Sequence, residues 1–391
     1  MLSWLGTCGA MDSELKLTVL LQGAVAEDQL GFHRGFEKLV REGQLTEYTP
    51  YPYGANRSDK DWASYYGRVL RHMRATGSNA LLCQFFHSTA IADPRRFLEE
   101  VTLLPQIPII ATSCGDPFGP LLASPPQSLT QACSRSDVTF VTSMGALSRK
   151  LQRSGAKRIT LMPSSACDER FGLEPDWAGP EGQEFDVVFI GSRPGGRNPA
   201  NHLYWSGRRR TEAVSLLNKR YGRRFGLFGQ GWGGLTAWQG PVSFIDQLST
   251  SQRGAVVYGG YPGSLCDYYT SNRVSIQALS GRPIVDHWVP RVDTLLRPGA
   301  DWILTRDLKE VIGSIDKLLN DPDLAQAVGS SGARAVANRH MDSHRTALMI
   351  SIMREVYNSR IQGREPRCPS LDYFHAGVDV PSEMRTALRA W

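Results

Sequence analysis

Two glycine-rich segments in the second half of the chain each follow a short apolar run. Gly191-Ser192-Arg193-Pro194-Gly195-Gly196-Arg197 follows FDVVFI, and GQGWGG, with Gly231 and Trp232, follows FGLF. Glycines after a strand let the backbone approach a ligand, and their N–H groups can bind phosphate. Arg193 or Arg197 would add charge-assisted hydrogen bonds to a diphosphate. The first segment matches neither GxGxxG nor a P-loop, so a flexible turn is an equal alternative. Trp232 would either stack on a nucleotide base or pack in the hydrophobic core, and core packing is the slightly favoured interpretation.

A second anion site is predicted where Tyr269-Thr270-Ser271-Asn272-Arg273-Val274-Ser275 opens a helix. Ser271 is suited to cap this helix and leave its first N–H groups directed outward, and Arg273 would add positive charge. The alternative is a cap beside a surface arginine. The segment precedes ALSGRPIVD, a helix–glycine–strand connection that would bring it to a sheet edge.

His87 and Asp116 are candidates for a general base. They follow the apolar runs Asn79–Phe86 and Ile107–Thr112, as Gly23 follows Leu15–Gln22. In a parallel sheet the carboxyl ends of strands meet at one rim, where ligands bind. A carboxylate or imidazole there can take a proton from an acceptor hydroxyl. Taken singly, such residues are more often structural.

The elements that must position these residues alternate between strands and helices. Apolar runs predict strands at 15–22, 79–86, 107–112, 138–142 and 158–162, then at 185–190, 224–228, 254–258, 283–286 and 302–304. Helical spacing predicts helices at 28–42, 61–76, 94–103, 126–134 and 144–154, then at 208–219, 243–249, 272–279, 291–296, 308–320, 323–338 and 343–361. This alternation is typical of α/β proteins whose parallel sheets are covered on both faces.

Length and composition favour two domains. The chain has 391 residues, of which 41% are hydrophobic and 21% charged, and a domain usually has roughly 100–200 residues. Gly172–Gln183 is rich in glycine, proline and charge and predicts a hinge. We expect a disordered leader over 1–12, one Rossmann-like domain over 13–171, a linker over 172–183, a second Rossmann-like domain over 184–350, and a tail over 351–391 that packs back on the body.

Several classes of protein are disfavoured. No apolar run approaches the roughly 18–20 residues of a membrane helix, and Met1–Met11 holds no basic residue, so we expect a cytoplasmic protein without a signal peptide. The seven cysteines are dispersed without a CxxC pair, which predicts reduced thiols and no metal site. Basic residues gather between Arg208 and Arg224. A solvated helix face is the favoured interpretation, and an anion-binding patch is the alternative.

Ser271–Arg345 resembles the C-terminal signature of GT-B glycosyltransferases. The segments in order are SNRVSIQALSGRPIVD, RVDTLLRPGADWIL and DLKEVIGSIDKLLNDPDLAQAVGSSGARAVANRHMDSHR. SDVTFVTSMGALSRKLQRSGAKRITLMPSSACDERFG resembles the end of a GT-B N-terminal domain, and FDVVFIGSRPGGRN and GLFGQGW are similar to the CgeB-like branch. The resemblance implies an acceptor domain over 13–171, a donor domain over 184–350 and a UDP- or GDP-sugar held in the cleft between them. It implies no bound metal and no permanent cofactor.

The resemblance also implies roles for individual residues. Asn272, Arg273 and Ser275 match its donor-phosphate segment, and Gly191, Ser192 and Arg193 match its diphosphate loop. His87 resembles a strand-end histidine near the donor sugar, and Asp116 an acidic strand-end residue. Arg197, Gly231, Trp232 and Tyr269 complete the predicted donor site. Many retaining members carry a Glu-x7-Glu pair at the donor helix, where this chain has Gln277 and no clear pair.

The predicted function is transfer of a sugar from a nucleotide-sugar to an acceptor hydroxyl. Two alternatives on the same scaffold are a nucleotide-sugar epimerase and a non-catalytic protein that binds sugar nucleotides. The acceptor is open among a glycan, a lipid head group, a protein and an anionic polymer such as modified DNA. Tyr51, Tyr53, Trp62, Tyr65 and Tyr66 would form either an aromatic platform for it or part of the core.

Overall fold

The computed structural model describes residues 14–56, 58–86, 91–116, 124–172, 183–193, 202–260 and 266–367. Two predicted site residues, His87 and Arg197, lie outside this part of the chain. So do the predicted leader, most of the predicted linker and the tail beyond residue 367.

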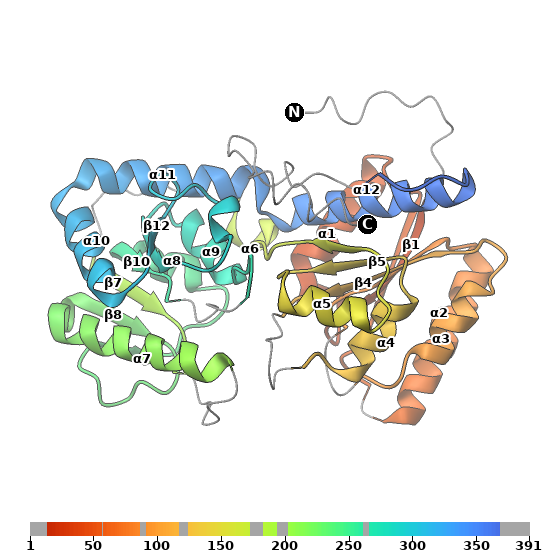
Figure 1. Cartoon of the computed structure of the whole chain (residues 1–391), viewed down its shortest axis with the longest axis horizontal. Coiled ribbons are helices and arrows are strands. Elements are labelled where there is room, and N and C mark those ends of the chain that lie inside the picture. The colour runs from red at the N-terminus through yellow and green to blue at the C-terminus, as the bar shows by residue number, and fades with distance from the viewer. Residues whose placement is uncertain are drawn as a thin grey trace.

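Two six-stranded sheets organise the chain, and they form two lobes that lie side by side (Figure 1). All neighbouring strands of the first sheet are parallel, in the order β2-β1-β3-β4-β5-β6. The sheet changes direction between β1 and β3, and ligands bind at such switch points in open α/β sheets. Its strands are β1 (Lys16–Leu21), β2 (Glu47–Pro52), β3 (Ala80–Cys83), β4 (Ile109–Cys114), β5 (Val138–Val141) and β6 (Ile159–Leu161).

Helices cover both faces of the first sheet, because its central strands are apolar on both sides. Leu17, Val19 and Leu21 of β1 share a core with α1, whereas Leu20 of the same strand packs with α2 and α3. The helices of this lobe are α1 (Leu30–Arg41), α2 (Asp59–Thr76), α3 (Arg95–Thr102), α4 (Gln127–Arg135), α5 (Ala146–Arg153) and the short α6 (Asp168–Phe171). A 3-10 turn, η1 (Ala26–Gln29), leads into α1.

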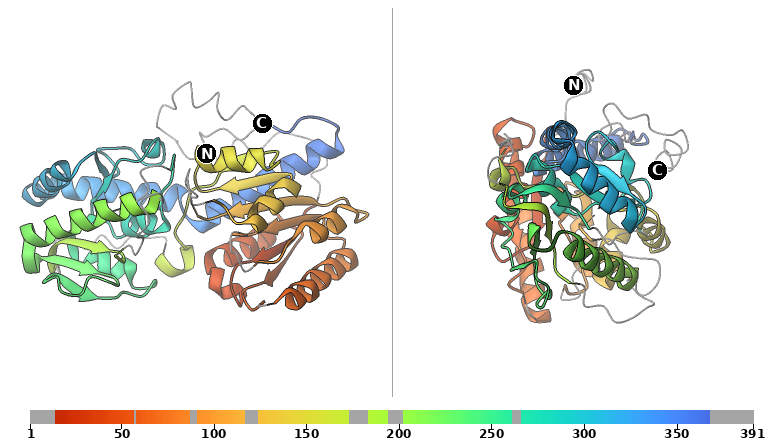
Figure 2. Two further views of the ribbon diagram at one scale, coloured as in Figure 1. Left: turned by 60° about the horizontal axis from the view of Figure 1, so that its bottom comes forward. Right: turned by 90° about the vertical axis from the view of Figure 1, so that its left-hand side faces the viewer.

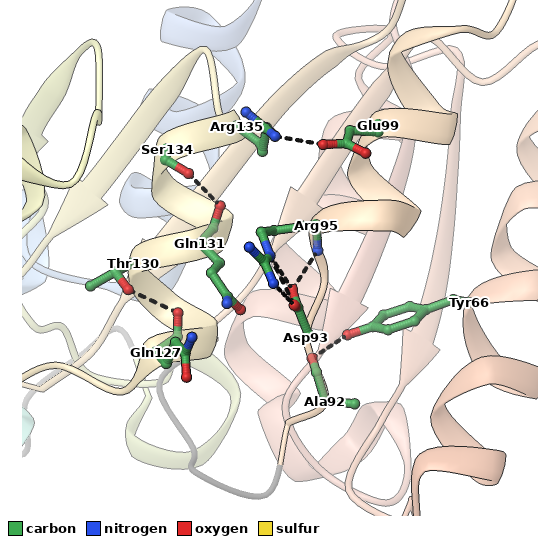
Figure 3. A network of polar contacts seen from close by, with 10 residues as sticks. All are labelled: Tyr66, Ala92, Asp93, Arg95, Glu99, Gln127, Thr130, Gln131, Ser134 and Arg135. Carbon is green, nitrogen blue, oxygen red and sulfur yellow. Dashed lines mark hydrogen bonds and ion pairs between the residues drawn. The ribbon is translucent and has the colours of Figure 1, made fainter.

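Surface ion pairs tie the outer helices of this lobe together (Figure 3). Arg135 of α4 pairs with Glu99 of α3 at 2.5 Å. Just before α3, Asp93 accepts hydrogen bonds from the Arg95 side chain, and Tyr66 of α2 donates to the carbonyl of Ala92 at 3.1 Å. These contacts lie on the outside of the lobe and connect α2, α3 and α4.

The second sheet is also parallel throughout, in the order β12-β11-β10-β7-β8-β9. Read from β9, this is the Rossmann order, with its switch point between β7 and β10. Its strands are β7 (Phe185–Ile190), β8 (Phe225–Phe228), β9 (Trp238–Gly240), β10 (Gly254–Tyr258), β11 (Ile284–His287) and β12 (Ile303–Thr305).

The second sheet is likewise covered on both faces. α7 and α10 pack on one face with Val187 and Phe189 of β7, whereas α9 packs on the other with Val257 of β10. The helices of this lobe are α7 (His202–Tyr221), α8 (Gln247–Gln252), α9 (Asn272–Leu279), α10 (Leu308–Asn320) and α11 (Pro322–Arg339), with 3-10 turns η2 (Gly222–Arg224) and η3 (Val292–Thr294). The structure thus confirms the prediction of two Rossmann-like α/β halves.

The last described helix, α12 (Asp342–Ile361), returns the chain to the first lobe (Figure 2). It packs against α1, where Gly31 and Gly35 allow close approach: a Cβ at Gly35 would lie 2.5 Å from Oγ1 of Thr346. The second lobe therefore ends before Asp342, earlier than the boundary expected at residue 350. One hydrophobic core runs through α1, α9, α11 and α12 and joins both sheets.

Candidate active site

A cavity of about 540 Å³ lies between the two lobes, at the carboxyl ends of the first sheet. Its wall includes Gln22, which follows β1, and Phe85, which follows β3, so the cavity opens at the switch point of this sheet. The second lobe contributes Phe244, Tyr269 and Asn272. The volume is within the range of about 300–1,000 Å³ that is usual for small-molecule sites.

Asp116 lies in this cavity, as its position after β4 predicts. Its carboxylate is exposed, and its backbone carbonyl accepts a hydrogen bond from Sγ of Cys114 at 3.2 Å. The Tyr269 side chain of the second lobe is close enough for electrostatic coupling: burial, and then the charge of Asp116, raise the pKa of Tyr269. The structure therefore brings three predicted site residues, Asp116, Tyr269 and Asn272, to one cavity.

The predicted diphosphate loop and the predicted donor helix α9 meet at the end of β7. Arg273 donates through Nη1 to the carbonyl of Ile190, at the end of β7, at 2.9 Å. Its guanidinium lies so close to Gly191 that a Cβ there would come within 2.6 Å of Nη1. Gly231 packs on Arg193, with 3.1 Å between an added Cβ and Cβ of Arg193. In the described part of the chain, Gly191, Ser192, Arg193, Gly231 and Arg273 do not line the cavity itself.

Two backbone donors of this region have no partner among the described residues. Gly191 donates its N–H to Phe228 and Arg193 donates to Gln230, whereas the N–H of Ser192 between them donates to no described residue. The N–H of Asn272, the first residue of α9, likewise donates to no described residue. Ser271 caps α9, as predicted, by accepting from the N–H of Arg273. These N–H groups are suited to bind an anion.

Arg210 of α7, one of the basic residues between Arg208 and Arg224, contacts two loops of the second lobe. It donates through Nε to the carbonyl of Gly260 and through Nη1 to that of Ser192, both at 3.0 Å. It therefore bridges the loops after β10 and β7, which flank the switch point of the second sheet. Arg210 and Arg273 both lie over the ring of Phe189 at 5.9 Å, so two cations flank the end of β7.

Three polar or aromatic residues of this region are too deeply buried to contact a nucleotide-sugar directly. Trp232 is 2% exposed and donates from Nε1 to the carbonyl of Gly191 at 2.6 Å, so it cannot offer a face to a base and instead supports the loop. Ser275 is 5% exposed. Gln277 is fully buried, and neither of its side-chain polar atoms has a hydrogen-bond partner within the described ranges.

The aromatic residues proposed as an acceptor platform belong to the core. Tyr53, Trp62, Tyr65 and Tyr66 are all buried and pack together with Phe86 and Phe97. Their ring centroids lie 4.5–6.3 Å apart. Half-buried Tyr51 packs at the edge of this cluster. Core packing, the other interpretation of these residues, is therefore the correct one.

The floor of the cavity is built where the chain crosses between lobes. Ser165, Arg170, Asp342 and Arg345 all line it. Arg345 is completely buried and donates to the carbonyls of Pro163 and Arg339, each at 2.7 Å. It also lies 2.7 Å from Nδ1 of His340. Burial and the charge of Arg345 lower the pKa of His340, so a neutral imidazole accepts this bond.

Three of the seven basic residues between Arg208 and Arg224 are paired with acidic residues. Arg220 pairs with Asp316 at 3.0 Å, Arg224 with Asp186 at 2.6 Å, and Arg208 with Glu212 at 3.6 Å. None of these arginines lines the described cavity. The arrangement favours the solvated helix face over a dedicated anion-binding surface.

Other expectations concern thiols, metals and membranes. Five cysteines of the described ranges are free thiols, and all five are buried. Within those ranges, no cluster of three or more His, Cys, Asp or Glu side chains is arranged to hold a metal ion. No described helix combines the length and apolar character needed to cross a bilayer.

Solved structures share this arrangement of two facing sheets. Trehalose 6-phosphate synthase from Burkholderia multivorans superposes with a TM-score of 0.59 at 11% identity, covering 91% of this chain and 100% of the other. A glycosyltransferase from Rickettsia africae gives 0.55 at 9% identity, covering 88% and 99%. HepE from Anabaena, in complex with UDP-glucose, gives 0.54 at 13% identity, covering 86% and 98%. At these identities the likeness shows the fold, which is GT-B.

The fold is GT-B, and a family model matches part of the chain, from α7 to α12. Residues 208–351 match the family model described as glycosyl transferase-like. This match begins in α7 and ends within α12, so it contains α9, the predicted donor helix. No curated protein sequence matches the chain. The more specific likeness to the CgeB-like branch stays a prediction.

Proposed function

We propose that this protein transfers a sugar from a UDP-sugar to an acceptor hydroxyl, without a bound metal. The observation that carries the proposal is the joint cavity, in which Asp116 of the first lobe faces Tyr269 and Asn272 of the second. HepE, a solved structure of the same fold, is known in complex with UDP-glucose. That complex favours UDP over GDP as the nucleotide of the donor.

In this proposal the diphosphate lies at the switch point of the second sheet. The N–H groups of Ser192 and Asn272 and the guanidinium of Arg273 would bind its oxygens. Arg210 would hold the loops after β7 and β10 at the spacing that the ligand needs. Donors fixed before the reaction stabilise charge that develops on the leaving diphosphate.

Asp116 is proposed to act on the acceptor, across the cavity from the donor helix. As a carboxylate beyond a strand end it could accept the proton of the attacking hydroxyl. His87, which lies outside the described residues, stays the second candidate for the general base. Closure of the lobes would exclude water and limit hydrolysis of the donor.

Nucleotide binding gives the first test. In a thermal-shift series with UDP, UDP-glucose, GDP and GDP-mannose, the uridine ligands are expected to stabilise the protein. A ligand at about 100 times its dissociation constant should add about 2.7 kcal/mol to the free energy of unfolding. The shift should persist in EDTA. Absence of stabilisation by all four ligands would contradict the proposal.

Product analysis separates the proposed reaction from its two alternatives. Incubation with donor alone would give a new nucleotide-sugar if the protein were an epimerase. Binding of UDP-glucose without release of UDP across a broad set of acceptors would indicate a protein that binds sugar nucleotides without catalysis. UDP release that depends on an acceptor would support transfer.

A further inference from the structure

The start of α12 places a carboxylate at the floor of the cavity. Asp342 lines the cavity yet is only 8% exposed. Its Oδ1 accepts a hydrogen bond from Oγ of Ser165 at 2.5 Å, which fixes the orientation of the carboxylate. Its Oδ2 lies against Gly31 of α1, where an added Cβ would come within 2.0 Å of it.

None of the described residues donates a hydrogen bond to the second oxygen of this carboxylate. No hydrogen bond or ion pair of the described residues reaches Oδ2, although Oδ1 is bonded to Ser165. Because Asp342 lines the cavity and Oδ2 is not sealed off from it, this oxygen can accept a hydrogen bond from a molecule in the cavity. A hydroxyl of a bound ligand can supply that donor.

The charges around the cavity favour a neutral ligand. Three carboxylates, Asp28, Asp116 and Asp342, line it together with two arginines, Arg170 and Arg345. Both arginines are engaged: Arg345 with the carbonyls of Pro163 and Arg339, and Arg170 with the carbonyl of Glu27 and the ring of Phe244. The described lining thus has no excess of positive charge with which to attract a phosphate or a nucleic acid.

We propose that Asp342 and Ser165 form an acceptor subsite for a neutral, hydroxyl-rich unit of about the size of one monosaccharide. Oδ2 of Asp342 accepts a hydrogen bond from a hydroxyl of that unit, and Ser165 holds the carboxylate in position. The inference rests on the proposed glycosyl transfer and names its acceptor class. A cavity of about 540 Å³ accommodates such a unit beside a donor sugar.

The titration of Asp342 adds a pH dependence to this subsite. Burial raises its pKa from 3.8 to about 6, and Asp168 of α6 contributes in the same direction, whereas Ser165, Arg345 and Arg170 oppose the shift. The carboxylate is therefore ionised, and the stronger acceptor, above pH 6. Acceptor affinity is expected to increase as the pH is raised through 6.

The test measures UDP release from UDP-glucose with three sets of acceptors: neutral monosaccharides and polyols, sugar phosphates, and hydroxymethylated DNA. We expect turnover with at least one neutral sugar. In Asp342→Asn, KM for that sugar should increase tenfold or more, while Kd for UDP stays within twofold. Ser165→Ala should increase the same KM by a smaller factor.

Asp168→Asn is the matched control. Asp168 accepts from the backbone N–H and the hydroxyl of Ser343, so it supports the same helix start, but it does not line the described cavity. Its substitution should leave KM for the acceptor unchanged at pH 8, where Asp342 is ionised with or without the charge of Asp168. Asp342→Asn should also raise Tm at pH 8, where ionisation of the buried carboxylate costs stability, and leave Tm unchanged at pH 3.

Several results would overturn the inference. They are an unchanged KM in Asp342→Asn, an equal increase in Asp168→Asn, and turnover restricted to sugar phosphates or DNA. Failure of the wild-type protein to bind any uridine nucleotide would instead overturn the proposed function, so the two failures are distinguishable.

Discussion

Arg273→Ala is expected to cost about 2–4 kcal/mol of transition-state stabilisation, a decrease of roughly 30- to 1,000-fold in kcat/KM for the UDP-sugar. The guanidinium lies at the end of β7, bonded to the carbonyl of Ile190 and packed on Gly191. From there the guanidinium would stabilise the negative charge that develops on the leaving diphosphate. Arg273→Lys should recover only part of the loss, because an ammonium cannot hold the Ile190 carbonyl and a phosphate oxygen in one planar geometry.

Arg253→Ala is the control for this variant. Arg253 also lies over aromatic rings of the second sheet, those of Phe185 and Phe228, each at 5.2 Å. It precedes β10, at the opposite end of the strands, where it pairs with Glu184. Its loss should leave kcat/KM unchanged, and UDP affinity measured by calorimetry should decrease in Arg273→Ala alone. Full turnover in Arg273→Ala would remove Arg273 from the donor site.

Asp116→Asn is expected to decrease kcat by roughly 10²- to 10⁴-fold, the usual contribution of a positioned general base. The amide keeps the shape of the side chain but cannot take a proton from the acceptor. Because Asp116 belongs to the first lobe, affinity for UDP should change little. The measurement is steady-state release of UDP at saturating acceptor, together with the Kd of UDP.

Asp93→Asn gives the comparison for Asp116. Asp93 is an exposed aspartate of the same lobe, paired with Arg95 on its outer surface (Figure 3). It should keep wild-type kcat. If Asp116→Asn also kept wild-type kcat, the base would have to be another residue, and His87→Ala would be the next variant to measure.

The alternation of strands and helices could be predicted from the sequence because buried parallel strands are short apolar runs. The segment FDVVFI forms β7 at Phe185–Ile190, as predicted. The segment DLKEVIGSIDKLLN contains α10, which spans Leu308–Asn320 as predicted. β2 was missed because EYTPYP holds two prolines and is half-buried throughout, as an edge strand can be. β9 was missed because three residues, two of them exposed, carry no periodicity.

The rim residues of the candidate site could also be predicted. Asp116 follows a strand, and Asn272 follows a capping serine. Their neighbours in the sequence were therefore sufficient to predict that both lie at the cavity. Asp342 and Ser165 could not be predicted, because they are 177 positions apart and meet only where α12 returns to the first lobe. Arg210 was hidden among neighbouring arginines, and only the geometry separates its two loop contacts from theirs.

A crystal structure of the protein with UDP tests the central claim most directly. The account predicts that the diphosphate lies within hydrogen-bond distance of the Ser192 and Asn272 N–H groups and of the Arg273 guanidinium. Its β-phosphate, which carries the sugar in the donor, should be directed toward Asp116. UDP bound elsewhere on the protein, with these groups unchanged and without contact to it, would contradict the account.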